Sequence, residues 1–202
     1  MLGELLDLVF PARCAGCGEV GAAVCDGCRL RLRPAPPLGA PVGVDRLVAA
    51  FEYEGVAREL VARVKYRNER AGVGLLADAV VRSLGQAGIG RPTVVTWVPT
   101  TAERRRSRGF DHAALLARAV ARGLHVPARG LLVRVGGPPQ TGRPAAQRRA
   151  GPQFAARLPA GEGTVLLVDD VVTTGATLRA AARALRSAGA PAVVAAVAAR
   201  TP

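Results

Sequence analysis

The segment at residues 165–178, VLLVDDVVTTGATL, constrains the fold of this chain more than any other. Its first four residues are apolar, which is typical of a strand buried on both faces of a sheet. Two adjacent aspartates follow, and a run of small residues then leads into a helix predicted at 175–190. In open α/β sheets, ligands bind beyond the carboxyl ends of the strands. The segment therefore predicts a binding loop at 169–177.

Strand and helix patterns alternate along the rest of the chain. Strands are predicted at residues 45–55, 93–98, 128–135, 165–168 and 193–199. Helices are predicted at residues 56–67, 72–88, 111–124 and 175–190. Half of the 202 residues are hydrophobic, so the chain can bury a sizeable core and does not have the composition of a disordered protein. We expect an α/β fold with a mostly parallel sheet that is flanked by helices.

A proline-rich connector, PAPPLGAP at residues 34–41, divides the chain. We predict a small module at residues 1–40 and the main domain at residues 41–202. The module begins with MLGELLDLVF, whose apolar residues have helical spacing, so we expect an amphipathic helix that packs on the core. This start is acidic rather than basic, which argues against a secretory signal. We therefore expect a cytoplasmic location without membrane insertion.

All four cysteines lie in the first module. They are Cys14, Cys17, Cys25 and Cys28, two C-x-x-C pairs separated by seven residues. Each pair can form a knuckle on one tetrahedral Zn²⁺, and a module of this size needs a metal to fold. Disulfides are disfavoured in the cytoplasm, and a thioredoxin-like redox motif has a single pair. We predict a structural zinc site.

The loop after the acid pair has the chemistry of a phosphate cradle. Three threonine hydroxyls and a glycine at residues 173–177 precede a helix whose first N–H groups are free to bind an anion. No Walker A motif is present, so a P-loop nucleotide triphosphatase is not indicated. A ribose 5-phosphate suits both features, because its hydroxyls can donate to Asp169 and Asp170 while the loop binds its phosphate. The acid pair can also help to hold Mg²⁺. An aspartate that only caps a helix is the alternative, but a cap needs one acid.

The segment resembles the phosphoribosyl pyrophosphate signature of type I phosphoribosyltransferases. Further motifs resemble the ComF family, a group of phosphoribosyltransferase-like proteins that is associated with DNA uptake and carries an N-terminal zinc module. These motifs are CAGC at 14–17, CDGC at 25–28, YEG at 53–55, KYR at 65–67, RRRSRGF at 104–110, PPQTG at 138–142 and VDDVVTTGAT at 168–177. The resemblance covers nearly the whole chain.

The chain departs from the family pattern at two places. The family commonly has Asn-Gln after Arg-Gly-Phe, whereas this chain has Asp111 and His112. An asparagine often follows the arginines near position 148, whereas this chain has Ala150 and Gly151. Both departures concern the acceptor side of the site rather than the phosphoribosyl side. A lone histidine such as His112 has two alternatives, a proton shuttle or a structural residue at a helix start.

The resemblance implies a site for phosphoribosyl pyrophosphate and Mg²⁺. Asp169 and Asp170 would bind the ribose hydroxyls. The 5′ phosphate would be bound by Thr173, Thr174, Gly175, Ala176 and Thr177. A pyrophosphate-binding loop would follow the strand at 93–98, and Arg108 in the basic run is the preferred contact there. No residue can be assigned as a general base.

Lys65 is conspicuous because it is the only lysine among 28 basic residues, in a chain with a net charge of +13. A compact ammonium suits a point contact with phosphate oxygens. A pyrophosphate contact and an unremarkable surface position are the two alternatives for this residue.

The interval at residues 136–154 contains glycines, prolines and arginines but no apolar periodicity. Long loops in compact domains often act as lids. Arg143, Arg148 and Arg149 would then close over the reacting groups. An insertion without a function is the alternative.

Two classes of function fit these features. In the first, the protein is a phosphoribosyltransferase that transfers the phosphoribosyl group to an acceptor which no motif identifies. In the second, it is a non-catalytic accessory that binds single-stranded DNA or DNA-processing proteins and retains the phosphoribosyl site as a sensor or relic. The high positive charge favours a polyanionic partner, but one Trp, two Tyr and four Phe give few stacking platforms for bases.

Overall fold

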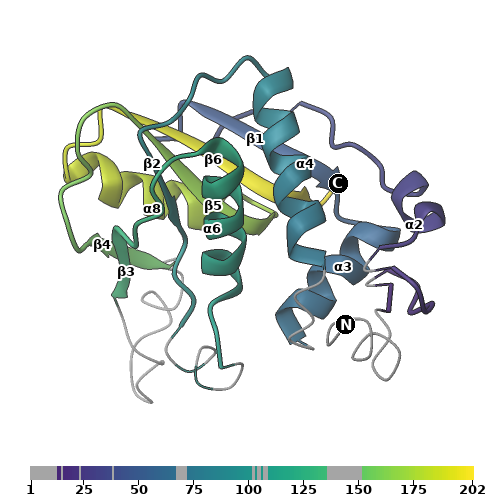
Figure 1. The fold of residues 1–202 in the computed structure, drawn as a ribbon. Coiled ribbons are helices and arrows are strands. Elements are labelled where there is room, and N and C mark those ends of the chain that lie inside the picture. The colour runs from purple at the N-terminus through teal and green to yellow at the C-terminus, as the bar shows by residue number, and fades with distance from the viewer. Residues whose placement is uncertain are drawn as a thin grey trace.

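A parallel sheet forms the centre of the protein (Figure 1). The computed structural model describes residues 13–14, 16–22, 24–37, 39–66, 72–101, 103, 106, 109–135 and 152–202. In these residues the sheet has four strands in the order β1-β6-β5-β2, and each neighbouring pair is parallel. The strands are β1 (Arg46–Glu52), β2 (Val94–Trp97), β5 (Thr164–Val172) and β6 (Ala192–Arg200). The predicted α/β fold with a parallel sheet is confirmed.

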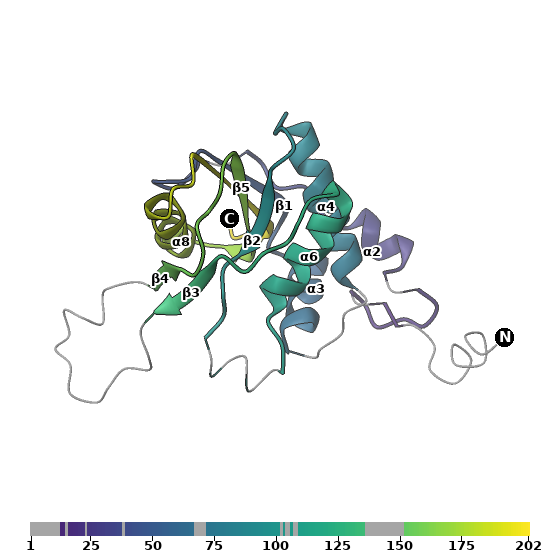
Figure 2. The same cartoon turned by 60° about the vertical axis from the view of Figure 1, so that its left-hand side comes forward.

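Helices cover both faces of this sheet (Figure 2). α4 (Val73–Gln86) and α6 (His112–Leu124) pack on one face, and α8 (Ala176–Ser187) packs on the other. α3 (Gly55–Tyr66) contributes Leu60 and Val61 to the core on the α4 and α6 side. Within the described ranges, no helix combines the length and apolar character that crossing a membrane requires.

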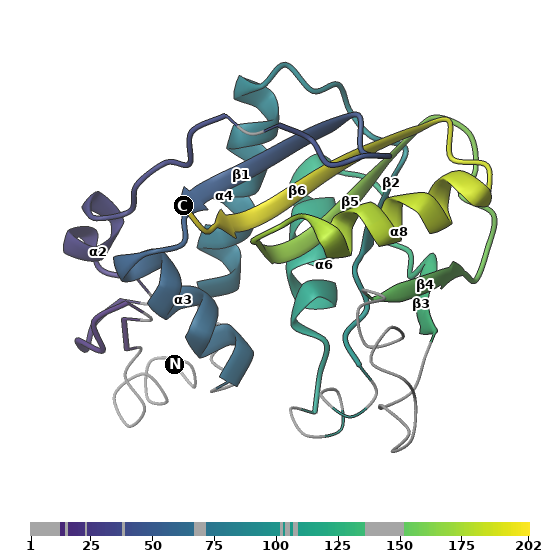
Figure 3. The same ribbon diagram turned by 180° about the vertical axis from the view of Figure 1, so that it is seen from behind.

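The central strands are apolar on both faces because both faces are covered. Val165, Leu166, Leu167 and Val168 of β5 are fully buried. On α8, buried leucine and alanine residues recur at helical spacing and pack on the face of the sheet seen in Figure 3. The burial of these side chains is the main favourable contribution to folding.

One predicted strand has a different place in the structure. β3 (Leu132–Val135) does not join the main sheet but pairs with β4 (Gln153–Ala156) in a separate antiparallel pair beside α8. Two of its four residues are exposed and one is half-buried, so it lacks the continuous burial of a central parallel strand. The sequence did not predict β4, whose first two residues belong to the interval predicted as a lid. The rest of that interval, apart from Pro152, lies outside the described residues.

The cysteine segment packs against the main domain. It includes the short helix α2 (Asp26–Leu30), and Cys14, Val24 and Cys28 are buried in the same hydrophobic cluster as residues of α3 and α4. The connector is also anchored, because the Ala35 N–H donates to the carbonyl of Ala50 in β1. The amphipathic helix predicted at residues 1–10 lies outside the described residues, and the boundary near residue 40 stays a prediction.

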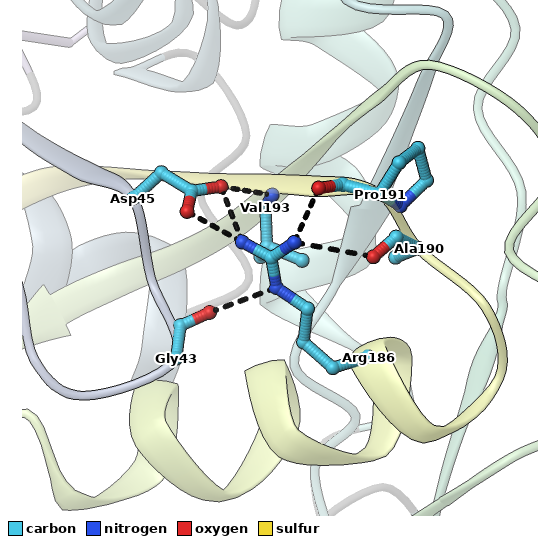
Figure 4. Close-up of polar contacts among 6 residues, drawn as sticks. All are labelled: Gly43, Asp45, Arg186, Ala190, Pro191 and Val193. Carbon is cyan, nitrogen blue, oxygen red and sulfur yellow. Dashed lines mark hydrogen bonds and ion pairs between the residues drawn. The ribbon is translucent and has the colours of Figure 1, made fainter.

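A polar clamp joins the amino ends of β1 and β6 to the last turn of α8 (Figure 4). The guanidinium of Arg186 lies 2.5 Å from both carboxylate oxygens of Asp45 and also donates to the carbonyls of Ala190 and Pro191. The same carboxylate accepts the N–H of Val193 at 2.7 Å. The clamp closes the end of the sheet opposite the carboxyl ends of the strands, where ligands are expected.

We expect Arg186→Lys to destabilise the protein. One terminal nitrogen of the guanidinium contacts Asp45 while the other donates to two backbone carbonyls, and a single ammonium nitrogen cannot reach both sets of acceptors. The side chains of Arg186 and Asp45 are 32% and 48% exposed, so we expect a loss of only about 1–2 kcal/mol in the free energy of unfolding. This corresponds to a fall of about 2–8 °C in Tm, measured by thermal denaturation. Arg183→Lys, at an exposed position on the same helix, is the matched control and is expected to leave Tm unchanged. Equal effects of the two substitutions would contradict the role of the clamp.

Candidate functional site

The acid pair lies within β5 rather than after it. β5 pairs with β2 only as far as Val168, but it continues beside β6 to Val172. The predicted strand, which ended at Val168, was therefore too short, because pairing with β6 extends it by four residues. Asp169 and Asp170 consequently lie beyond the end of β2, at the carboxyl edge of the sheet where the sequence predicted a binding site.

The carboxylate of Asp170 is held by nitrogen atoms from two different helices. Nζ of Lys65, near the end of α3, lies 2.8 Å from Oδ1. Nε2 of His112, in the first turn of α6, lies 2.6 Å from Oδ2. The side chains of Asp170, Lys65 and His112 are 13%, 17% and 10% exposed. The surface alternative for Lys65 therefore does not fit the structure.

The two acids have different environments. Burial raises the pKa of Asp169 well above its ordinary value, and the neighbouring charge of Asp170 raises it further. Burial alone would also raise the pKa of Asp170, but His112 and Lys65 together lower it below its ordinary value. Oδ1 of Asp169 accepts the N–H of Asp170 at 2.9 Å. The negative charge therefore resides more readily on Asp170 than on Asp169.

The small-residue loop leads directly into α8. Gly175 precedes the helix with a φ of 70°, a left-handed conformation that favours glycine. A Cβ at this position would also lie 3.2 Å from Cβ of Pro41. The backbone conformation and the limited space therefore both favour glycine at position 175. Oγ1 of Thr174 accepts the N–H of Ala176 at 3.4 Å. The first turn of α8 contains no acidic side chain, so its N–H groups and positive dipole end are suited to an anion.

Asp111 connects the loop after β2 to the start of α6. One of its carboxylate oxygens accepts the N–H of Thr100 at 3.2 Å, and the other caps the helix by accepting the N–H of Ala114 at 3.3 Å. The cap fixes the first turn of α6, from which His112 reaches Asp170. Asp111 and His112 are the residues that depart from the family pattern. The first caps α6, and the second contacts Asp170.

The structure brings together some of the predicted site residues and adds others. Asp169, Asp170 and Lys65 form one cluster, and the loop at 173–177 follows them on the chain. Predicted site residues that lie outside the described residues are Arg108, Arg143, Arg148 and Arg149. The sequence analysis did not predict the contact of His112 with Asp170. A helix start after the strand at 93–98 did place His112 near the carboxyl edge, but no local pattern identified its partner.

The four cysteine sulfurs form a second candidate site. All four Sγ atoms lie within 4.8 Å of one another, and those of Cys17 and Cys25 are 3.7 Å apart. Tetrahedral zinc with Zn–S bonds of about 2.3 Å requires sulfurs about 3.8 Å apart. Sγ of Cys14 accepts the backbone N–H groups of Gly16 and Cys25, both at 3.3 Å, as in a metal-binding knuckle. The donor set therefore fits a tetrahedral zinc ion.

The ionisation of these thiols also indicates a cation. Burial opposes ionisation of Cys14, but backbone N–H groups lower its pKa to about 6. Although a backbone N–H stabilises the Cys17 thiolate, burial and the neighbouring cysteines raise its pKa to about 12. Clustered thiolates repel one another, and a bound divalent metal would offset that repulsion.

Comparison with known proteins supports the resemblance seen in the motifs. The Phosphoribosyl transferase domain family matches residues 111–202, which include the acid pair and its loop. Competence protein ComFC of Bacillus subtilis (strain 168) is 28% identical over 183 residues, which cover 87% of this chain and 72% of ComFC. The chain is similar to a ComF-family protein and shares the phosphoribosyl transferase domain over its second half. The resemblance stated from the motifs is confirmed.

Solved structures similar to this chain include several phosphoribosyltransferases. The purine phosphoribosyltransferase of Pyrococcus horikoshii Ot3 is 18% identical with a TM-score of 0.40, over 62% of this chain and 70% of that protein. The orotate phosphoribosyltransferase of Aeropyrum pernix is 23% identical with a TM-score of 0.40, over 65% of this chain and 60% of that protein.

We expect Asp169→Asn to stabilise the ligand-free protein at neutral pH. An aspartate with a raised folded pKa contributes its full stability below its unfolded pKa of about 4 and loses it as the pH rises toward the folded pKa. Asparagine does not ionise and retains an oxygen for the N–H of Asp170. The Tm of the variant minus that of the parent should therefore grow by a few degrees between about pH 4 and pH 7.

Asp170→Asn is the matched control for this titration. Because the folded pKa of Asp170 is lowered, its contribution is present above its unfolded pKa and is lost as the pH falls. The control should destabilise the protein at neutral pH, by a deficit that stays nearly constant down to about pH 4 and shrinks below it. A Tm difference for Asp169→Asn that is constant with pH would show that Asp169 is not held protonated.

Proposed function

We propose that the carboxyl edge of the sheet binds phosphoribosyl pyrophosphate together with Mg²⁺. The observation that carries this proposal is the acid pair of β5, which extends past β2 and runs into a glycine turn and the amino end of α8. Acceptors for a sugar diol thus lie a few residues from donors for a phosphate. The similarity to ComFC and the phosphoribosyl transferase domain support the same ligand.

The proposed ligand contacts follow from the chemistry of each group. Asp169 and Asp170 accept hydrogen bonds from the ribose hydroxyls, and their oxygens are the hard ligands that Mg²⁺ prefers. The loop at 173–177 binds the 5′ phosphate through backbone N–H groups and threonine hydroxyls. Lys65 and Arg108 contact the pyrophosphate, and Arg143, Arg148 and Arg149 belong to a lid over the site.

For the reaction, we propose transfer of the phosphoribosyl group to an acceptor. The bond between C1′ and the pyrophosphate oxygen breaks, pyrophosphate leaves with the electron pair, and the acceptor forms a bond to C1′. When bound, Mg²⁺ neutralises charge on the departing pyrophosphate. The protein positions the sugar and stabilises charge, so no nucleophilic side chain is required.

In the cell, we propose a ComF-like role in DNA uptake or DNA metabolism, with phosphoribosyl pyrophosphate as the small-molecule partner. The name of ComFC, a competence protein, supports this role. A cytoplasmic location fits it, because the four cysteines are then kept reduced and available to a metal.

A second candidate function is binding of single-stranded DNA without catalysis. A pocket of about 440 Å³ beside the loop after β2 is lined in part by aromatic and basic side chains, which suit single-stranded DNA. Its aromatic and basic lining residues include Trp97, Phe110, Arg118, Arg134 and Arg157. The guanidinium carbon of Arg118 lies 5.6 Å from the centroid of the Trp97 ring. Exposed arginines beside aromatic rings suit phosphates and stacked bases.

We further propose that the four cysteines hold one structural Zn²⁺. Cys14 and Cys28 belong to the core cluster that includes residues of α3, so the metal supports the helix that carries Lys65.

Phosphoribosyl pyrophosphate with Mg²⁺ is expected to raise Tm, because a ligand that binds only the folded state stabilises it. At about 100 times the Kd, the gain is about 2.7 kcal/mol, which corresponds to about 5–11 °C. The double variant Asp169→Ala with Asp170→Ala is expected to lose this shift. Thermal denaturation of both proteins with and without the ligand measures it.

The matched control is Asp78→Ala, at an exposed position on α4. It should keep the full shift. An unchanged Tm in the parent protein would contradict the site assignment. If the parent instead bound single-stranded DNA with a steep salt dependence, and the double variant bound equally well, the second candidate function would be favoured.

We expect about one zinc per chain by elemental analysis of the purified protein. Cys17→Ser removes an exposed ligand and should reduce the zinc content and lower Tm. Removal of the metal from the parent by a chelator should lower Tm in the same way, because Cys14 and Cys28 lie in the core. A metal-free protein with the Tm of the untreated protein would exclude a structural zinc.

A further inference from the structure

Both oxygens of the Asp170 carboxylate are engaged in the ligand-free structure. Nζ of Lys65 lies 2.8 Å from Oδ1, and Nε2 of His112 lies 2.6 Å from Oδ2. A sugar hydroxyl that donates to this carboxylate therefore competes with one of the two nitrogens. A ligand that binds the Asp170 carboxylate must therefore displace one of these two nitrogens.

Lys65 is the partner that can leave. It is the second-last residue of α3, and a flexible stem of four carbons carries its ammonium. His112 is in the first turn of α6, which the Asp111 cap fixes, and its ring has only two rotatable bonds and is 10% exposed. The lysine can move its charge by several ångströms at the cost of side-chain torsions, whereas the histidine cannot.

The displaced ammonium needs a new anion. The Lys65 side chain is 17% exposed, so most of its surroundings are protein and not water. Leaving one member of a largely buried ion pair without a partner is strongly unfavourable. A sugar that carries a pyrophosphate at C1 offers anionic oxygens beside the diol, whereas ribose 5-phosphate has only a hydroxyl there.

We propose that Lys65 is the specificity-determining residue that makes this site select a pyrophosphorylated sugar over ribose 5-phosphate. The inference rests on the proposed function, since it assumes that Asp170 binds the ribose diol. Lys65 pairs with Asp170 in the free protein and with the pyrophosphate in the complex. The site rejects the monophosphate because that ligand breaks the ion pair without replacing it.

The test compares two ligands on the full chain by isothermal titration calorimetry at constant Mg²⁺. The probes are phosphoribosyl pyrophosphate and ribose 5-phosphate, and the measured quantity is the ratio of their dissociation constants. In Lys65→Met, the affinity for the pyrophosphorylated sugar should fall while that for ribose 5-phosphate stays equal or rises. The ratio should fall by at least about tenfold, the effect expected for a charge-assisted hydrogen bond.

Three variants separate this role from a structural one. Lys65→Arg keeps the charge and should retain most of the selectivity ratio. His112→Gln, which restores the residue common in the family, should change the affinity for both ligands by a similar factor, because His112 stays at Asp170. Arg58→Met, at an exposed position on the same helix, should change neither affinity.

Lys65→Gln provides a second neutral side chain if the methionine variant does not fold, and circular dichroism checks the fold of each variant. A parallel loss of affinity for both ligands in a folded neutral variant would overturn the inference but leave the proposed function intact. A parent protein that binds neither sugar would overturn both.

Discussion

The carboxylate of Asp170, enclosed at the end of β5, is the charge around which the candidate site is organised. Its two polar partners come from the end of α3 and the start of α6, so a single side chain ties a central strand to two helices. A charge with this little exposure is tolerated only when it is paired. The positions of Lys65 and His112 are thus linked, since a change at either one alters the environment of the same carboxylate.

Two adjacent aspartates do not perform the same task here. Oδ1 of Asp169 accepts the N–H of Asp170, and burial raises the pKa of Asp169, whereas His112 and Lys65 lower the pKa of Asp170. Two adjacent carboxylates repel each other when both are ionised, and here the ammonium of Lys65 pairs with only one of them, Asp170. A ligand or metal that joins the pair changes the charge balance of both acids.

The sequence predicted the sheet, its covering helices and the acid pair because each has a local signature. Apolar runs such as 193–199 and helical periodicity such as that of 175–190 are visible in short windows. β4 was not visible, because QFAA is short and only partly buried, and its strand state depends on pairing with β3. The partner of His112 was not visible either. That contact joins residues 58 positions apart on two elements, and only the packing of α6 against β5 brings them together.

The contact between Pro41 and Gly175 gives the proline-rich connector a position in the wall of the phosphate loop. Pro41 is the last residue of this connector. A proline has little conformational freedom to lose, so the connector can stiffen the turn at small entropic cost. The end of the segment that carries the cysteines therefore lies against the glycine turn, so a larger side chain at position 175 would press on the connector.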